Sequence, residues 1–257
     1  MAGWDPELYL KFGGERTQPS IDLVSRIAVD RPQRVVDLGC GPGNSTQILR
    51  KRWPDATIIG VDSDPNMIAA ARREYPEGRW EQQDIADWTA DAPFDVVFSN
   101  AALHWLTDHE TLFPRLLRSV APGGVLAVQM PSVTASPVHR AIWKIASDAR
   151  WSDRLAAARN AQTMHPPAFY YDVLRPHVSR LDQWETEYLH PLEGPAAIVD
   201  WIRSTALRPF LDALSTDEER QTFVGWLLDS LTDAYPRLAD GRVLVPYRRQ
   251  FLVASPA

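Results

Sequence analysis

The sequence contains very little cysteine: Cys40 is the single thiol among 257 residues. One cysteine excludes a disulfide within the chain and is typical of proteins from a reducing cytoplasm, which is the location we expect. Because Cys40 stands between two glycines, we interpret it as a small residue in a tight turn rather than as a nucleophile.

The sequence also lacks long apolar runs and an excess of basic residues. No stretch reaches the roughly 18 apolar residues of a membrane span. The first residues show no basic segment followed by an apolar one, so we expect neither a signal peptide nor contact with a membrane. The formal net charge of −6 argues against a general nucleic-acid-binding protein, which needs a basic face.

The stretch 34–46, Arg-Val-Val-Asp-Leu-Gly-Cys-Gly-Pro-Gly-Asn-Ser-Thr, is the most informative part of the chain. Its apolar beginning predicts a buried strand, and its three alternate glycines, Gly39, Gly41 and Gly43, predict a sharp turn. Asn44, Ser45 and Thr46 can cap the helix that follows. A strand, a glycine-rich turn and a helix N-terminus together form a nucleotide site in open α/β sheets.

The glycine spacing decides which nucleotide is expected. In a dinucleotide fingerprint, G-x-G-x-x-G, the third glycine would stand where Asn44 is found. Asp37 at the end of the strand would repel a pyrophosphate and would suit a ligand with an ammonium group. Two alternatives of other classes stay open, a nicotinamide-dependent oxidoreductase and a cofactor-binding regulatory protein without turnover, although the early glycine and Asp37 speak against the first.

Apolar segments alternate with helical patterns along the chain. Further strands are predicted at 56–61, 79–82, 94–98, 125–130, 181–189 and 243–254, and helices at 5–12, 19–28, 47–53, 112–120, 139–149, 196–202 and 217–235. Asp64 and Pro65 are expected to open one more helix, whose apolar face carries Met67, Ile68 and Ala71. This alternation indicates an α/β fold with a doubly wound, mainly parallel sheet of seven strands. We predict one domain: N-terminal helices in 1–30, a cofactor-binding core in 31–131, and a C-terminal half in 132–257 with a helical cap at about 195–240.

Polar residues follow several of the predicted strands. Asp62 ends the second strand, 23 residues after Gly39, where a carboxylate can accept two hydrogen bonds from a ribose diol. Asp84 follows the third strand and Asn100 the fourth. Because parallel strands end at the same edge of a sheet, these side chains are expected at one ligand site. Met67, on the next helix, is expected to cover one face of a bound base.

These motifs resemble the class I S-adenosylmethionine-dependent methyltransferases. Further segments resemble the narrower family of trans-aconitate methyltransferases, among them Trp4–Phe12, Asp62–Met67, Asn100–Leu106, Tyr170–Leu174, Ile198–Ile202 and Tyr247–Val253. The resemblance implies S-adenosylmethionine as cofactor and transfer of its methyl group to a carboxylate of trans-aconitate. It also implies that Asp84 binds the adenine amino group and Ile85 packs on the ring.

The expected site residues fall into two groups. Cofactor contacts are predicted for Tyr9, Arg16, Asp37, Gly39, Gly41, Asp62, Met67, Asp84, Ile85, Asn100 and Trp105. Because guanidinium groups bind carboxylates in bidentate fashion, a tricarboxylate substrate calls for arginines and hydrogen-bond donors, and its contacts are predicted for Trp4, Tyr170, Tyr171, Trp201, Arg208 and Arg248. Another small or carrier-bound acid stays open as the acceptor.

The predicted reaction needs no catalytic base and no metal. A carboxylate is already ionised at neutral pH, with an ordinary pKa near ~4, so positioning alone can make it a nucleophile. His104 and His109 have no third metal ligand in view. The resemblance leads us to expect an uncharged polar residue where His104 stands.

Overall fold

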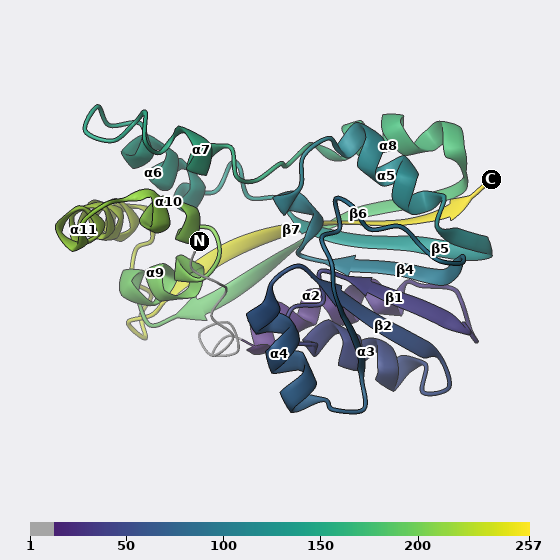
Figure 1. Ribbon diagram of the computed structural model, residues 1–257. Helices are drawn as coiled ribbons and strands as arrows, with labels where there is room; N and C mark the ends of the chain where they lie inside the picture. The colour runs from purple at the N-terminus through teal and green to yellow at the C-terminus, as the bar shows by residue number, and fades with distance from the viewer. Residues whose placement is uncertain (1–12) are drawn as a thin grey trace. The chain divides into compact units, whose positions relative to one another are not determined.

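The computed structural model describes residues 13–257, with side chains from residue 17 onwards, and its helices and strands are labelled in Figure 1. Its described residues divide into two compact units. We call residues 13–131, 163–186 and 249–257 the sheet unit, and residues 132–162 and 187–248 the helical unit. The long strands β6 (Val178–Leu192) and β7 (Val243–Pro256) contribute residues to both.

A seven-stranded sheet in the order β3-β2-β1-β4-β5-β7-β6 forms the centre of the fold. Its first five strands in sequence are β1 (Arg34–Leu38), β2 (Thr57–Asp62), β3 (Arg79–Gln82), β4 (Phe94–Asn100) and β5 (Val120–Pro131). These five pair in parallel, whereas β7 pairs antiparallel with β5. The prediction of a doubly wound, mainly parallel sheet of seven strands is confirmed.

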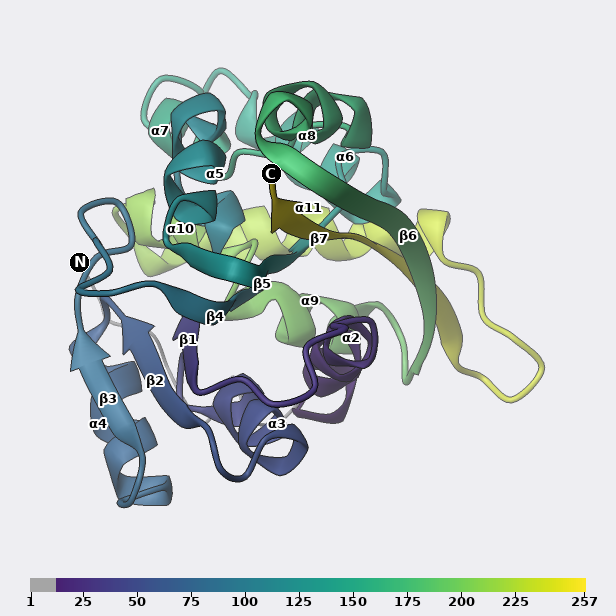
Figure 2. The same cartoon turned by 90° about the vertical axis from the view of Figure 1, so that its right-hand side faces the viewer.

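Helices cover both faces of the sheet within the sheet unit. They are α2 (Gly13–Ser25), α3 (Asn44–Arg52), α4 (Pro65–Glu74), α5 (His109–Leu117) and α8 (Pro167–Leu174), with the short 3-10 helices η1 (Leu103–Trp105) and η2 (Arg175–His177). Figure 2 shows α5 and α8 on one side of the sheet and α2 and α3 on the other. Crossover helices on both faces bury a parallel sheet, which explains why its strands are apolar almost throughout.

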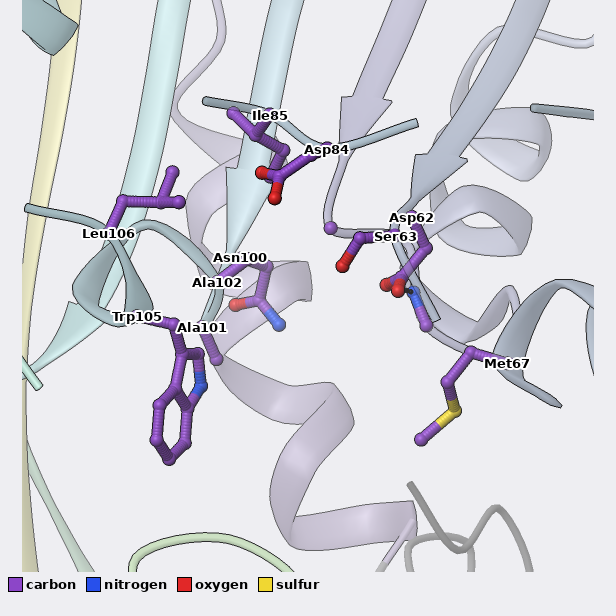
Figure 3. A pocket seen from close by; sticks show the side chains of 12 residues that line it. Asp62, Ser63, Met67, Asp84, Ile85, Asn100, Ala101, Ala102, Trp105 and Leu106 are labelled. Atoms are coloured by element: carbon purple, nitrogen blue, oxygen red, sulfur yellow. Dashed lines mark hydrogen bonds between the residues drawn. The ribbon is translucent and has the colours of Figure 1, made fainter. Parts of the chain in front are cut away.

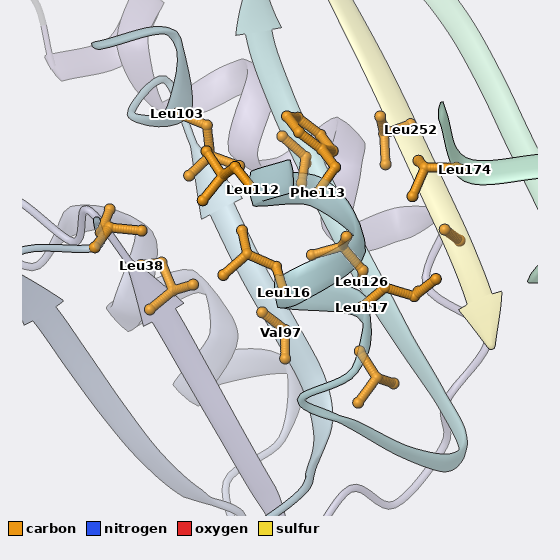
Figure 4. Close-up of a cluster of buried hydrophobic side chains, with 14 of the residues drawn as sticks. Leu38, Val97, Leu103, Leu112, Phe113, Leu116, Leu117, Leu126, Leu174 and Leu252 are labelled. Carbon is orange, nitrogen blue, oxygen red and sulfur yellow. The ribbon is translucent and has the colours of Figure 1, made fainter. Parts of the chain in front are cut away.

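The main core lies between the sheet and the α5–α8 face. Side chains of the strands, among them Leu38, Val97, Leu126 and Leu252, pack there on Leu112, Phe113, Leu116 and Leu117 of α5 and Leu174 of α8 (Figure 4). Most of these side chains are fully buried, so the two helices fix the strands whose ends carry the candidate site.

The helical unit is built from α6 (Pro137–Ala146), α7 (Ala156–Arg159), α9 (Pro195–Arg203), α10 (Arg208–Ala213) and α11 (Asp217–Ala234). The long helix α11 packs on α6 and α9. It begins with a capping box, in which the Thr216 hydroxyl accepts a hydrogen bond from the Glu219 backbone and the Glu219 carboxylate accepts one from the Thr216 backbone. Helices were predicted from the sequence at α6, α9 and α11. Among the described residues, no helix is long and apolar enough to cross a membrane.

Several boundaries differ from the sequence-based expectation. Gly13 and Gly14 begin α2 instead of ending a helix, and Pro19 lies inside it. The helix predicted at 112–120 ends at Leu117, and the residues that follow it start the longer strand β5. No helix was predicted at α8, where Pro167 occupies the first turn and its missing N–H has no consequence. The helix predicted at 5–12 lies outside the described residues.

Because the core is closely packed, we expect truncation of a buried side chain on α5 to lower stability strongly. We expect Leu116→Ala, at a fully buried position, to lower the free energy of unfolding by ~2–5 kcal/mol, because it leaves a cavity. The matched control is Leu189→Ala, at a side chain that is 55% exposed, which should change stability by no more than ~0.5 kcal/mol. Urea unfolding measures both, and equal effects would contradict this description of the core.

Candidate functional site

The glycine turn after β1 adopts a backbone that favours glycine. Gly39, Gly41 and Gly43 have φ values of +77°, +55° and +97°. The N–H groups of Gly39 and Cys40 both donate to the carbonyl of Val61 at the end of β2, at 2.8 and 3.0 Å. A Cβ on Gly39 would lie 2.1 Å from the Cβ of Ala102, whereas a Cβ on Gly41 would meet nothing within 4 Å. Gly39 is therefore required both by its left-handed backbone and by the close approach of Ala102. Gly41 is required by its left-handed backbone alone.

Asp37 connects the end of β1 to the start of α3. Its Oδ2 accepts hydrogen bonds from the hydroxyls of Ser45 and Thr46, at 2.7 and 2.6 Å. Burial raises the pKa of Asp37 to about 6, against the opposing effect of these two bonds. The prediction that Ser45 and Thr46 cap α3 is wrong, since the N-cap is Gly43 and no side chain caps the helix.

Cys40 is buried beside this carboxylate. Burial, and after it the negative charges of Asp37 and Asp62, raise the pKa of its thiol well above the ordinary value. A protonated, inaccessible thiol agrees with the interpretation of Cys40 as a small turn residue.

Asp62 fixes the turn from the neighbouring strand. Its Oδ2 accepts from the N–H of Gly41 and its Oδ1 from the N–H of Asp64, each at 2.9 Å. Burial raises the pKa of Asp62, while these backbone hydrogen bonds lower it. Each carboxylate oxygen keeps a second lone pair, so the side chain can still accept hydrogen bonds from a ligand.

Asp64 caps the helix that carries Met67. Its Oδ1 accepts from the N–H groups of Asn66 and Met67, at 2.8 and 3.2 Å, and Pro65 occupies the first turn. The predicted start of this helix is confirmed, and the cap sets where the Met67 side chain stands.

A pocket lies where these strands end, and Figure 3 shows its side chains around a common space. It is lined by Gly39, Gly41, Asp62, Ser63, Met67, Asp84, Ile85, Asn100, Ala101, Ala102, Trp105 and Leu106. Eight of the predicted cofactor residues thus come together. Sequence reasoning missed Ser63, Ala101, Ala102 and Leu106. Three of these stand next to a predicted residue in the chain, and Ala102 stands two residues after Asn100.

Of the other predicted cofactor residues, Asp37 does not line this pocket. Asp37 lies beneath the turn and is fully buried. Tyr9 lies outside the described residues, and Arg16 belongs to α2 with a side chain that is not described.

Two predicted substrate tyrosines of the sheet unit lie away from the pocket lining. Tyr170 is 1% exposed, and its hydroxyl lies 2.8 Å from Nδ1 of His109. Because Nε2 of His109 faces the carbonyl of Leu103 at 3.0 Å, it must carry the proton, and Nδ1 accepts from Tyr170. Tyr170 is therefore a core residue, whereas Tyr171 beside it is about half exposed.

The remaining predicted substrate residues belong to the helical unit. Trp201 packs on His190 and Tyr247, with ring centroids 4.8 and 5.0 Å apart. Arg208 lies 3.5 Å from the carboxylate of Asp212, and Arg248 lies 3.5 Å from that of Glu187. Trp4 lies outside the described residues.

His104 is buried behind Trp105, with ring centroids 5.0 Å apart. Burial and, after it, the positive charge of Arg249 lower the pKa of His104 to about 3. The imidazole is therefore neutral at pH 7, although histidine itself departs from the residue that the resemblance led us to expect here. No group of three or more potential metal ligands occurs among residues 13–257.

Comparison with known proteins identifies the family. The sequence profile of a family described as "Methyltransferase domain" matches residues 35–124. A protein of Azoarcus sp. is 45% identical over 99% of both chains, and one of Methylobacterium nodulans is 48% identical over 99% of this chain and 98% of its own. Both are named trans-aconitate 2-methyltransferase. The chain belongs to this methyltransferase family.

Solved structures show the same fold at low identity. The YcgJ protein of Bacillus subtilis matches with a TM-score of 0.61 and 15% identity, over 93% of this chain and 99% of its own. Phosphoethanolamine N-methyltransferase 2 of Haemonchus contortus, solved with S-adenosyl-L-methionine, matches with a TM-score of 0.56 and 16% identity, over 97% of this chain and 56% of its own. These likenesses confirm the fold of the methyltransferase class.

The glycine turn of this methyltransferase predicts a graded response to alanine. Gly41→Ala should cost ~1–2 kcal/mol of stability, because only the left-handed backbone is strained. Gly39→Ala should cost ~1–3 kcal/mol more, because its Cβ meets Ala102. The double variant Gly39→Ala/Ala102→Gly should recover part of that difference. Urea unfolding of the three variants tests this, and equal losses at both glycines would contradict it.

His104 predicts a specific pH dependence of stability. The folded protein holds His104 neutral down to about pH 3, whereas the unfolded chain takes up a proton below pH ~6.5. Stability should therefore fall as the pH drops below 6.5, with a slope from this group of at most ~1.4 kcal/mol per pH unit.

Comparison of the wild type with His104→Asn isolates this slope. Asp37 acts in the opposite direction between its ordinary value of 3.8 and its raised pKa of about 6, but it is present in both proteins and cancels in the difference. Denaturant titrations from pH 4 to 7 should show a weaker acid loss in the variant. Parallel curves would mean that His104 is not held neutral.

Proposed function

We propose that the protein is an S-adenosylmethionine-dependent O-methyltransferase that converts one carboxylate of trans-aconitate to its monomethyl ester. The observation that carries the proposal is the 44–48% identity, over nearly the whole chain, to proteins named trans-aconitate 2-methyltransferase. The pocket at the strand ends supports it independently, because its residue types fit the proposed cofactor.

The nucleoside part of the cofactor fits one side of the pocket. The Asp62 carboxylate is placed to accept from a ribose diol. Asp84 and Ile85 follow β3 and supply an acceptor for the adenine amino group and an apolar surface for its ring, while Met67 covers the other side of the pocket. A larger residue at Gly39 would not fit beneath this space, because Ala102 already occupies the position of its Cβ.

The amino-acid part of the cofactor fits the adjoining side. Two buried oxygens, Oδ1 of Asp37 and Oδ1 of Asn100, have no hydrogen-bond partner among the described residues. Oxygens of this kind satisfy the donors of an ammonium group, and Asp37 adds negative charge close to the turn. Cofactor contacts by Tyr9, Arg16 and Asp37, and substrate contacts by Trp4, Tyr171, Trp201, Arg208 and Arg248, stay predictions, as does the cap at about 195–240.

The proposed reaction requires the protein to position the acceptor and does not require a general base. S-adenosylmethionine supplies an electrophilic methyl group on a positively charged sulfur. The side chains of Ile85, Trp105 and Leu106 give the pocket apolar walls, which limit the access of water. The acceptor is already an anion, so the enzyme's residues need only hold it in line, an effect worth up to ~7–11 kcal/mol in well-oriented systems.

The direct test uses purified protein, S-adenosylmethionine with a labelled methyl group, and a panel of acids. Trans-aconitate, citrate, succinate and a medium-chain fatty acid each serve as acceptor, and mass spectrometry identifies the products. We expect the label in a monomethyl ester of trans-aconitate. Label in no ester would contradict the proposal, and a tight fluorescence titration with NADH would favour the oxidoreductase alternative.

The proposed cofactor site predicts the effect of Asp62→Ala. Loss of the carboxylate should weaken binding of S-adenosylhomocysteine, the demethylated cofactor, by ~1–3 kcal/mol, because the ribose hydroxyls lose their acceptor. The matched control is Asp91→Ala, an exposed carboxylate paired with Arg34, which should leave binding unchanged. Calorimetry measures both, and wild-type affinity in Asp62→Ala would place the ribose elsewhere.

A further inference from the structure

A group of buried polar side chains continues from Asn100 beyond the cofactor pocket. Gln129 on β5 is fully buried, and neither its amide nitrogen nor its amide oxygen has a hydrogen-bond partner among the described residues. The same holds for Nδ1 of the buried His104. Buried polar atoms are almost always hydrogen-bonded in folded proteins, so unpartnered atoms on these two residues favour a polar ligand.

The sheet register brings these residues together. Gln129 is the direct neighbour of Asn100 across β4 and β5, and its carbonyl accepts a hydrogen bond of 2.9 Å from the N–H of Ala101, which lines the pocket. On the other side, Gln129 pairs with Phe251 of β7. Arg249, two residues from Phe251, points to the same face as Gln129, because side chains alternate along a strand.

Arg249 brings a positive charge into this buried group. Its side chain is 6% exposed, and it lies close enough to His104 for its charge to lower the pKa of that imidazole. Arg249 already interacts within the protein, but a guanidinium group carries five N–H donors and can bind more than one acceptor. Its planar fork matches the two oxygens of a carboxylate.

Arg248 contrasts with its neighbour in the chain. Its side chain is 53% exposed and lies 3.5 Å from Glu187, which is itself about half exposed. Adjacent strand residues point to opposite faces, so one arginine of this pair is held inside and the other faces outward. The structure therefore favours Arg249 over the arginine that the sequence suggested.

The place in the sheet agrees with a role toward the acceptor. The residues that fit the cofactor follow β2, β3, β1 and β4, whereas Gln129 and Arg249 stand on β5 and β7, the next two strands. Neighbouring strands are ~4.8 Å apart. The buried group thus lies one to two strand spacings beyond Asn100, on the side away from Asp62.

We propose that Arg249, Gln129 and His104 form a subsite that binds a carboxylate of the acceptor beside the cofactor pocket. Arg249 supplies the charge and a bidentate fork, the Gln129 amide donates a hydrogen bond, and the neutral His104 completes the polar lining without adding charge. This assignment rests on the proposed function, because it presumes an acid as acceptor, and it makes Arg249 and Gln129 specificity-determining residues.

The test separates acceptor binding from cofactor binding. Calorimetry measures the affinity of trans-aconitate for protein saturated with S-adenosylhomocysteine and, in a second titration, the affinity of S-adenosylhomocysteine alone. Arg249→Leu should weaken trans-aconitate binding by ~10- to 100-fold, the effect of losing a charged hydrogen-bond partner. It should change S-adenosylhomocysteine affinity less than ~3-fold, since Arg249 does not line the cofactor pocket.

Further variants keep the test informative if Arg249→Leu does not fold. Arg249→Lys keeps the charge without the fork and should give an intermediate loss, and Gln129→Leu should weaken trans-aconitate binding with cofactor affinity retained. Arg180→Leu, which removes an exposed arginine of the sheet unit, is the charge control. Arg248→Leu tests the other arginine of the pair, and we expect near wild-type affinity.

Three results would overturn the assignment. The first is wild-type affinity for trans-aconitate in folded Arg249→Leu or in Gln129→Leu, and the second is a selective loss in Arg248→Leu. If the wild type binds S-adenosylhomocysteine but not trans-aconitate, the proposed function fails, and citrate, succinate and a fatty acid are titrated instead. If the wild type binds one of these acids and Arg249→Leu loses that binding, the subsite is supported. The third contradicting result is that the wild type binds none of the acids.

Discussion

The site depends on one carboxylate that ties two neighbouring strands and a helix together. Asp62 ends β2, holds the N–H of Gly41 in the glycine turn after β1, and holds the N–H of Asp64 at the start of α4. The two N–H groups of Gly39 and Cys40 add a second link to the same strand end. Hydrogen bonds to the end of β2 therefore hold the turn, with glycines where the backbone is left-handed.

The order of strands places chemically different residues side by side. Neighbouring parallel strands deliver Asp84, Asp62, the glycine turn and Asn100 at one edge of the sheet, where open α/β sheets bind ligands. The antiparallel strand β7 then adds Arg249, two residues from Phe251, the partner of Gln129. Along this edge, carboxylates that suit a ribose and an ammonium group come first, and a guanidinium group that suits an acid follows. A carboxyl methyltransferase needs this arrangement of charges, because it binds a cationic cofactor next to an anionic acceptor.

Local signals made the succession of strands and helices and much of the pocket predictable, while long-range contacts account for the errors. Asp64 was recognised as a helix cap because its partners are two and three residues away. Ser45 and Thr46 were misread as caps because Asp37, eight and nine residues away, takes their hydroxyls. The sequence could not tell which of two adjacent arginines faces inward, because that depends on the register of β7 with β5; the burial of Tyr170 likewise comes from packing on α5.

The most direct measurement of the central claim is a crystal structure with S-adenosylhomocysteine and trans-aconitate bound together. The account predicts the ribose on Asp62 and the adenine beside Ile85. It predicts a carboxylate of trans-aconitate at Arg249, with another carboxylate oxygen in line with the cofactor sulfur. A cofactor bound away from the glycine turn, or an acid bound far from the sulfur, would contradict it.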